Sequence, residues 1–300
     1  KGCRSARLKL RHKFSIFLCV MKIFNTFTEY FLTIIMNIRE IEYSRHFLVL
    51  AHGDYFPKNA FAAGKIFAQG FQKGLTLLVW ESEMSEEFKA ELEEEKKSLG
   101  DVPFICESVD GGFEDVVAMT ERTETPMIFI EFSKKRGFYR PMNFFKGFRE
   151  LRIPFIMLKD TMPMPNFDKI LVPVAFLPEE KEKGSYSSNM GRFLGSEIQI
   201  LQAKDYGTRA KKNVDAITKV YDGFELKYSV EMGKKDSFKV EKEAVEIAMN
   251  GEYGMVLITN SRDYGLDDII FGPKEKHLFN STTTPLMCIN PRGDLYVLCW

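Results

Sequence analysis

The chain has 300 residues, with 42 Lys and Arg balancing 42 Asp and Glu, and 45% of its residues are hydrophobic. This composition is typical of a globular protein and excludes a disordered, collagenous or coiled-coil chain. A formal net charge of zero gives no long-range attraction, so we expect neither nucleic acid nor a membrane as a partner. The scattered cysteines and histidines lack metal-ligand spacing, which predicts no metal site and favours the cytoplasm.

Residues 1–43 are predicted to form an N-terminal extension outside the folded unit. The stretch 14–36 is apolar, but Lys22 and Glu29 interrupt it. A membrane helix needs about 20 predominantly apolar residues, and a signal peptide is the other alternative because basic residues come first. We expect an extension instead, with Met36 as a candidate natural start.

Residues 44–160 alternate apolar runs of strand length with segments of helical periodicity. Ala60, Ala63 and Phe67 recur at spacings of three and four, which predicts a helix, and Gly74 is expected to end it. Ser85 is expected to cap the charged helix that follows. Strands are predicted at 46–51, 75–80, 103–106, 126–131 and 154–158, and helices at 57–72, after 85, at 112–122 and at 142–150.

The proline-rich segment 161–167 is predicted to be a linker, and the same pattern then restarts over 168–292. Continuous apolar strands between amphipathic helices indicate a parallel sheet that is covered on both faces. The sequence therefore predicts an α/β protein with two tandem Rossmann-like domains, each a five-stranded parallel sheet with helices on both faces. Residues 293–300 form a tail. In such sheets ligands lie at the carboxyl ends of the strands. The second set of strands is predicted at 169–174, 197–203, 225–230, 255–258 and 285–289.

Several of these segments resemble the universal stress protein family. KILVPVA at 169–175 is similar to its opening strand, and MVLITN at 255–260, followed by Gly265, Gly272 and PLMCI at 285–289, is similar to its last third. The first half keeps the pattern with weaker motifs. The resemblance implies an adenine-nucleotide alpha-hydrolase-like (HUP) fold and a stress-related cytoplasmic protein that is usually dimeric. It also implies that in a tandem chain the two halves pair with each other.

The resemblance further implies ATP, ADP or AMP as candidate ligands, but the phosphate loop departs from the family pattern. Ala175 stands where ATP-binding members have an Asp, while Thr259, Arg262 and Pro273 replace residues of a Gly-x-x-Gly … Gly-Ser/Thr loop, of which Gly272 alone fits. Glycines let backbone N–H groups close on phosphates. We therefore expect no conventional ATP binding. The candidate nucleotide contacts are Val174, Ala175, Ala203, Thr259, Asn260, Arg262, Gly265 and Gly272, with His52, Lys134, Lys135 and Arg136 in the first half.

Three functions stay open on the sequence. The leading hypothesis is a sensor or adaptor without catalysis, since the sequence assembles no catalytic or metal constellation and His52 is interpreted as a loop residue. The second is a nucleotide-binding or weakly hydrolysing stress protein that uses Arg262 or the basic loop 134–136. The third is a protein-interaction module whose partner surface is the phenylalanine-rich first half. An unidentified protein partner and a homodimer are also expected.

Overall fold

The computed structural model describes residues 45–80, 83–110, 112–133, 147–148, 151, 153–260 and 273–291. The predicted extension, the tail from residue 293 and most of the predicted helix at 142–150 lie outside these residues. A compact unit begins at Arg45.

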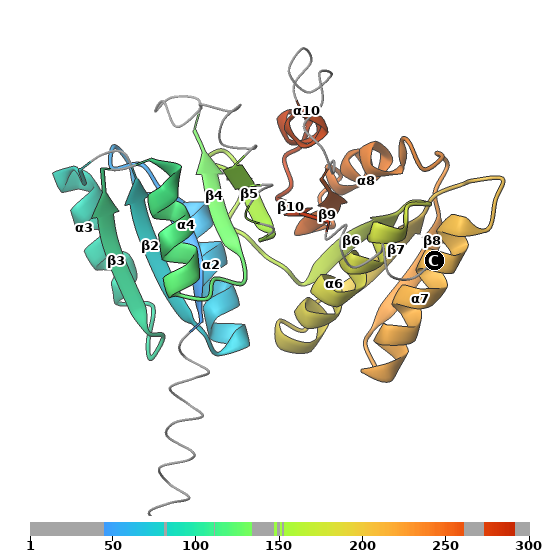
Figure 1. The fold of residues 1–300 in the computed structure, drawn as a ribbon, viewed down its shortest axis with the longest axis horizontal. Helices are drawn as coiled ribbons and strands as arrows, with labels where there is room; N and C mark the ends of the chain where they lie inside the picture. Colours follow the sequence, from blue (N-terminus) through green and yellow to red (C-terminus); the bar gives the residue numbers. More distant parts are fainter. Residues whose placement is uncertain are drawn as a thin grey trace, which may run out of the picture. The chain divides into compact units, whose positions relative to one another are not determined.

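In the described part of the first half, three helices alternate with the strands in the order that the sequence predicts (Figure 1). The elements are β1 (His46–Ala51), α2 (Lys58–Phe71), β2 (Gly74–Trp80), α3 (Glu86–Lys96), β3 (Phe104–Val109), α4 (Phe113–Arg122), β4 (Ile128–Phe132) and β5 (Phe155–Lys159).

The second half repeats this order. Its elements are β6 (Lys169–Val174), the 3-10 helix η1 (Pro178–Lys181), α6 (Glu182–Phe193), β7 (Glu197–Gln202), α7 (Arg209–Gly223), β8 (Tyr228–Met232), α8 (Val240–Ala248), β9 (Met255–Thr259), α10 (Lys274–Ser281) and β10 (Leu286–Ile289).

The described strands form one ten-stranded sheet in the order β3-β2-β1-β4-β5-β10-β9-β6-β7-β8. The first five and the last five strands have equivalent orders, and the pairs within each half are parallel. β5 and β10 join the halves as an antiparallel pair, in which Met157 lies opposite Leu286 and Phe155 opposite Cys288. The predicted α/β class with two five-stranded parallel units is confirmed. The exact domain boundaries stay a prediction.

The strand order reverses once in each half, and this reversal places helices on both faces. The chain moves outward from β1 to β2 and β3, then returns across β1 to β4. Because parallel crossovers are right-handed, the outward and returning connections pass over opposite faces. The reversal lies between β1 and β4 in the first half and between β6 and β9 in the second. We call these two places the first and the second switch point. Beyond the carboxyl ends of such strand pairs, open α/β sheets bind ligands.

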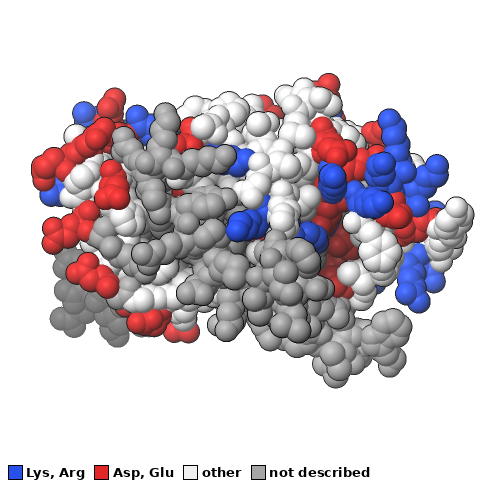
Figure 2. Space-filling view, turned by 90° about the horizontal axis from the view of Figure 1, so that it is seen from above, with Lys and Arg blue, Asp and Glu red and all other residues white. Residues whose placement is uncertain are grey.

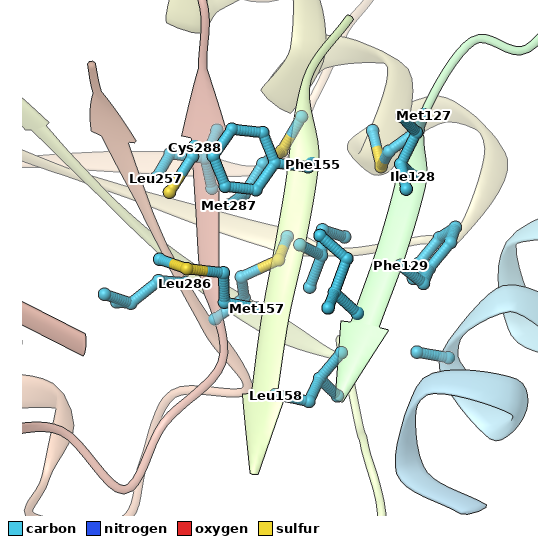
Figure 3. Close-up of a cluster of buried hydrophobic side chains, with 14 of the residues drawn as sticks. Met127, Ile128, Phe129, Phe155, Met157, Leu158, Leu257, Leu286, Met287 and Cys288 are labelled. Atoms are coloured by element: carbon cyan, nitrogen blue, oxygen red, sulfur yellow. The ribbon is translucent and has the colours of Figure 1, made fainter. Parts of the chain in front are cut away.

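Where the halves meet, the sheet is apolar on both sides of the β5–β10 pair. Met157, Met287 and Cys288 are fully buried between β4 and β9, as Figure 3 shows. On this strand pair the Phe148 ring lies 5.3 Å from the Phe155 ring. Truncating a fully buried side chain of this size to alanine costs about 2–5 kcal/mol, so this seam stabilises both halves together.

At the helix ends, one sequence expectation is confirmed and one is wrong. The Ser85 hydroxyl accepts the Phe88 N–H at 3.1 Å and caps α3. Gly74, expected to end α2, is instead the first residue of β2, where a Cβ would come within 2.4 Å of the His46 ring. The left-handed residue that ends α2 is Gln72, with φ of 54°. Gly74 is therefore required by close packing and not by helix termination.

Candidate functional site at the carboxyl edge of the sheet

Five of the sequence-predicted site residues lie along the carboxyl ends of three neighbouring strands of the second half. Val174 ends β6 and Ala175 follows it, Ala203 follows β7, and Thr259 ends β9 with Asn260 after it. All five are buried. The Ala203 N–H donates to the Val174 carbonyl at 3.0 Å, which ties the ends of β6 and β7 together.

The remaining candidates of the second half and the basic loop of the first half are not placed. Arg262, Gly265, Gly272, Lys134, Lys135 and Arg136 lie outside the described residues. Their contact with a nucleotide therefore stays a prediction.

A buried lysine that the sequence analysis did not single out stands at the second switch point. The Lys183 side chain, on α6, is 0% exposed. Its Nζ donates to the Pro173 carbonyl on β6 at 2.8 Å, to Glu180 Oε2 at 2.8 Å and to Glu241 Oε1 at 3.1 Å. Three acceptors match the three protons of an ammonium group, so this buried charge is fully hydrogen-bonded.

The two carboxylates beside Lys183 bind the backbone of the switch-point strands. Glu180 Oε2 accepts the Ala175 N–H at 3.0 Å, and Glu241 Oε1 accepts the Thr259 N–H at 2.8 Å. The Asn213 amide donates to the Ala175 carbonyl at 2.9 Å. These side chains come from η1, α8 and α7, so residues far apart in the sequence meet at the carboxyl ends of β6 and β9.

A second lysine extends the cluster across α10. Lys274 Nζ donates to Glu241 Oε2 at 2.6 Å and to the Thr259 carbonyl at 2.7 Å. Burial alone would raise the pKa of Glu241, but the charges of Lys274 and Lys183 outweigh it and hold that pKa well below its usual range. The charges of the two lysines and the two carboxylates balance. We call Glu180, Lys183, Glu241 and Lys274 the ion cluster.

The ion cluster occupies two backbone donors at the carboxyl edge of the sheet. At the ends of β6 and β9, the Ala175 and Thr259 N–H groups already bond to carboxylates. A phosphate group at these two N–H groups would have to displace the Glu180 and Glu241 carboxylates, which Lys183 and Lys274 hold in place. Within the described residues, the buried Thr259 hydroxyl and Asn260 Oδ1 have no hydrogen-bond partner. These two atoms are the polar groups that remain for a small ligand or a water molecule.

At the switch point of the first half lies a buried carboxyl group in place of a cation. Glu131 is in β4 and is only 3% exposed. Its Oε2 accepts the Ala60 N–H in the first turn of α2 at 2.9 Å, and its Oε1 accepts the Tyr55 hydroxyl at 3.4 Å. A carboxylate at a helix N-terminus complements the helix dipole, so Glu131 serves α2 as a cap supplied by another element.

The environment of Glu131 raises the pKa of its carboxyl group towards neutral pH. Burial raises its pKa most, the N–H groups of Ala60 and Asn59 lower it, and the charge of Asp160 raises it further, which brings the pKa of Glu131 to about 7. Burial of a carboxyl group disfavours its charged form. Glu131 is therefore the described carboxyl group best placed to change its charge near physiological pH.

Glu131 lines a cavity of about 430 Å³ at this edge of the sheet. Ser133 donates to Asp160 Oδ2 at 2.6 Å on its wall, and Lys58 lies 3.1 Å from Glu91. Three carboxyl groups against one lysine make this lining acidic, which disfavours a phosphate. The lining residues are Tyr55, Phe56, Lys58, Asn59, Glu91, Glu131, Ser133, Asp160, Met162 and Met164.

His52 follows β1, as the sequence predicts, in the turn that leads to α2. Its Nδ1 lies 3.0 Å from Asp54 Oδ2. In the part of the chain that the structure describes, no group of three His, Cys, Asp or Glu residues is arranged to hold a metal ion. Across the same residues, no helix is both long enough and apolar enough to span a membrane.

The residues that the sequence analysis missed had unequal sequence signals. Glu131 is a charge at the end of the apolar run PMIFIE, which is a visible anomaly. Lys183 and Glu180 lie in the charged stretch EEKEKG, whose pattern is that of an exposed surface helix. The phenylalanine-rich partner surface of the first half stays a prediction; among the described residues of that half, no phenylalanine is an exposed large apolar side chain.

No family model matches the sequence, and no curated protein matches it. Solved structures do match its fold. A putative universal stress protein from Pseudomonas aeruginosa UCBPP-PA14 aligns with a TM-score of 0.59 and 14% identity over 82% of this chain and 93% of its own. A universal stress protein from Archaeoglobus fulgidus aligns with a TM-score of 0.53 and 14% identity over 84% and 98%.

A third similar structure comes from a different setting. The cytoplasmic domain of a prokaryotic cation chloride cotransporter aligns with a TM-score of 0.52 and 9% identity over 81% of this chain and 94% of that one. The predicted universal-stress-type fold is thus confirmed. Because one fold hosts unrelated functions, the chemistry at the carboxyl edge must carry the functional argument.

Proposed function

We propose that this chain is a non-enzymatic sensor or adaptor of the cytoplasm, with the universal stress protein fold but without conventional ATP binding. The single observation that carries the proposal is the ion cluster. It bonds the N–H groups of Ala175 and Thr259 at the second switch point and sets two carboxylates there. The acidic lining of the first-half cavity supports the same conclusion for the other switch point.

The non-enzymatic character rests on what the described side chains do at the two switch points. Lys183 and Glu241 are held by each other and by backbone groups, so neither is positioned to transfer a proton to a substrate. A general acid or base needs to lie within hydrogen-bond reach of a bound substrate. Signalling through changes in partner binding is the use that this proposal assigns to the scaffold.

Nucleotide binding tests the proposal directly. A ligand that binds only the native state at about 100 times its Kd adds about 2.7 kcal/mol to the free energy of unfolding. We expect millimolar ATP, ADP or AMP with Mg²⁺ to leave the melting temperature of the full chain unchanged in a thermal-shift titration. Mg²⁺ alone is the control.

Two results would contradict the proposal. One is a rise of several degrees in the melting temperature with ATP. The other is an adenine nucleotide released when freshly purified protein is denatured, and identified by mass spectrometry.

A nucleotide-binding stress protein is the second candidate. The unpartnered Thr259 hydroxyl and Asn260 Oδ1 favour it, because buried polar atoms ordinarily have a partner. This candidate uses Arg262 as the phosphate contact that the missing glycines do not supply. If ATP does bind, Arg262→Ala abolishes the melting-temperature rise under this candidate, whereas Arg209→Ala, in α7, preserves it.

A further inference from the structure

Two loops at the carboxyl edge of the second half are held together by hydrogen bonds. The Lys204 N–H, after β7, donates to the Lys235 carbonyl, after β8, at 2.7 Å. Asp205 accepts hydrogen bonds from both the N–H and the hydroxyl of Ser237. Glu243 of α8 accepts the Lys235 N–H at 2.9 Å. The loops after β7 and β8 therefore form one rigid support.

Each of these loops carries an exposed aromatic ring. Tyr206 follows Asp205 and is fully exposed, and Phe238 follows Ser237 and is 85% exposed. These two side chains are the most exposed of the described aromatic residues. The Phe176 ring packs against the Phe238 ring at a centroid distance of 5.6 Å and steadies it. Two rings on a rigid support offer flat faces on which a planar ligand group can stack.

Unpaired cations flank both rings along the chain. Within the described residues, the exposed lysines and arginine of these loops and of the helix starts that follow them form no salt bridge. They are Lys204, Arg209, Lys212, Lys234, Lys235, Lys239 and Lys242. In Figure 2, the blue atoms of Lys and Arg gather at the right, over the second half. We call Lys204, Tyr206, Arg209, Lys234, Lys235 and Phe238 the basic platform.

The carboxylates of the same edge do not balance these cations. Asp205 and Glu243 are bonded to groups of the two loops, and Asp236 accepts a backbone N–H of its own loop at 3.1 Å. The exposed Glu231 accepts the amide of a β7 side chain at 2.7 Å. Glu246 lies more than a turn into α8, away from the loops. Positive charge is therefore in excess on the basic platform.

The first turn of α7 has the charge that a helix start ordinarily avoids. It carries Arg209, Lys211 and Lys212 but no acidic residue, and Thr208 at the N-cap makes no side-chain hydrogen bond to the helix. Of these three cations, Lys211 pairs with Asp215. Cations at this end oppose the helix dipole, whereas an anion is bound there by the dipole and by backbone N–H groups. A bound anion would therefore offset the unfavourable charge of this turn.

We propose that the basic platform binds single-stranded nucleic acid. The lysines, Arg209 and the start of α7 would hold successive phosphates, while bases stack on Tyr206 and Phe238. Proteins that bind single strands combine a positively charged surface with aromatic stacking faces in this way. The proposal goes beyond the sensor or adaptor function and does not depend on it, because the ion cluster is no part of the basic platform.

The residue types favour a nucleic-acid strand over an acidic protein. Exposed rings suit both partners, but lysine is depleted in protein–protein interfaces, whereas it is an ordinary phosphate contact. The rings favour a single strand over a duplex, because the bases of a duplex already stack on one another. A single strand is thus the partner that uses both the lysines and the rings.

The zero net charge of the chain does not oppose a local site of this kind. Net charge describes the field of the whole chain, and the sequence prediction of no nucleic-acid partner depends on it. In the sheet, β8 and β4 are six strand spacings apart, or about 29 Å. Exposed charges interact weakly beyond about 8 Å at physiological salt, so the acidic side chains of the first half, red in Figure 2, leave the basic platform effective.

Fluorescence anisotropy of the full chain with a labelled single strand tests the proposal. The probes are oligouridylate and oligothymidylate of about 12 nucleotides, which lies within the usual site size. We expect binding whose Kd rises about fiftyfold between about 50 and 200 mM NaCl, because four phosphate contacts give a salt slope of about −2.8. Binding of either probe supports the proposal, and the tighter of the two identifies the ligand as RNA or DNA.

Two variants separate the phosphate contacts from the stacking. Lys234→Gln/Lys235→Gln is expected to weaken binding at least about tenfold at low salt and to reduce the size of the salt slope by about 1.4. Tyr206→Ala is expected to weaken binding about fivefold or more with the slope unchanged, because it removes a stacking face and no charge. Tyr206→Phe keeps the ring and should bind as the parent does.

Lys97→Gln/Lys219→Gln is the matched control, since it removes two exposed lysines that lie outside the basic platform and form no salt bridge within the described residues. It is expected to keep the parent's affinity, and circular dichroism checks that every variant is folded. Three results would overturn the proposal. They are no binding of either probe at low salt, unchanged binding by Lys234→Gln/Lys235→Gln or by Tyr206→Ala, and equally tight binding of a duplex or of an aspartate-rich peptide of the same charge.

Discussion

Glu131→Gln is expected to remove about 2.5 kcal/mol of pH dependence from the free energy of unfolding between pH 5 and pH 8. The pKa of Glu131 is about 7 in the folded chain, against an ordinary value of 4.5, chiefly because the carboxyl group is buried. Between the ordinary pKa and the raised one, Glu131 is mostly protonated in the folded chain but mostly ionised in the unfolded chain. The contribution of Glu131 to the free energy of unfolding therefore falls as pH rises through 7.

A glutamine keeps the acceptor for the Ala60 N–H but never ionises. The variant is thus expected to match the parent near pH 5 and to be more stable than it at pH 8. Urea denaturation at several pH values, followed by tryptophan fluorescence, measures the difference. Glu121→Gln, at an exposed position on α4, is the matched control and should follow the parent at every pH. Parallel curves for Glu131→Gln and the parent would show that Glu131 does not hold a proton near neutrality.

Lys183→Met is expected to destabilise the chain by about 3–5 kcal/mol, the usual cost of removing one partner from a buried ion pair. Methionine fills a similar volume but donates no hydrogen bond. Glu180 Oε2 then keeps the Ala175 N–H as its donor, and the Pro173 carbonyl loses the donor that Lys183 supplied. The cost comes from the unpaired buried charge, not from lost packing.

The exposed Lys181→Met, two residues away, is the control and should change stability by less than about 0.5 kcal/mol. The double variant Lys183→Met/Glu180→Gln should recover part of the loss, because the unpaired carboxylate is gone as well. Urea denaturation of the parent, Lys183→Met, Glu180→Gln and the double variant completes the cycle, with Lys181→Met measured beside them. A single-variant cost below about 1 kcal/mol, or no recovery in the double variant, would mean that the ion cluster does not stabilise the second switch point.

Nearly all of the secondary structure could be predicted because it depends on local patterns. The apolar run HFLVLA became β1 with the predicted limits, and Ser85 caps α3 as its residue type and position indicate. The duplication was visible in the sequence because both halves repeat the same alternation of strands and helices. Gly74 shows where local reading fails, because its role is set by the His46 ring on another strand.

The candidate site could be located from the sequence but its chemistry could not. Ala175 and Thr259 were placed correctly at the carboxyl edge, since strand ends follow from strand limits. Their partners Glu180 and Glu241 are 61 residues apart by sequence number and come from different helices. No spacing rule connects residues whose contact depends on how helices pack over a sheet.

By itself, the sequence determined the alternation of strands and helices, its duplication and the residue types at the strand ends. These follow from side-chain periodicity and residue type, which act over a few neighbouring positions. Only the tertiary structure decided that Lys183 is buried among carboxylates while other charged residues of α6 stay nearer to solvent, and that β5 pairs with β10. Burial and long-range pairing decide the net effect of a charge, and both arise only when the elements pack together.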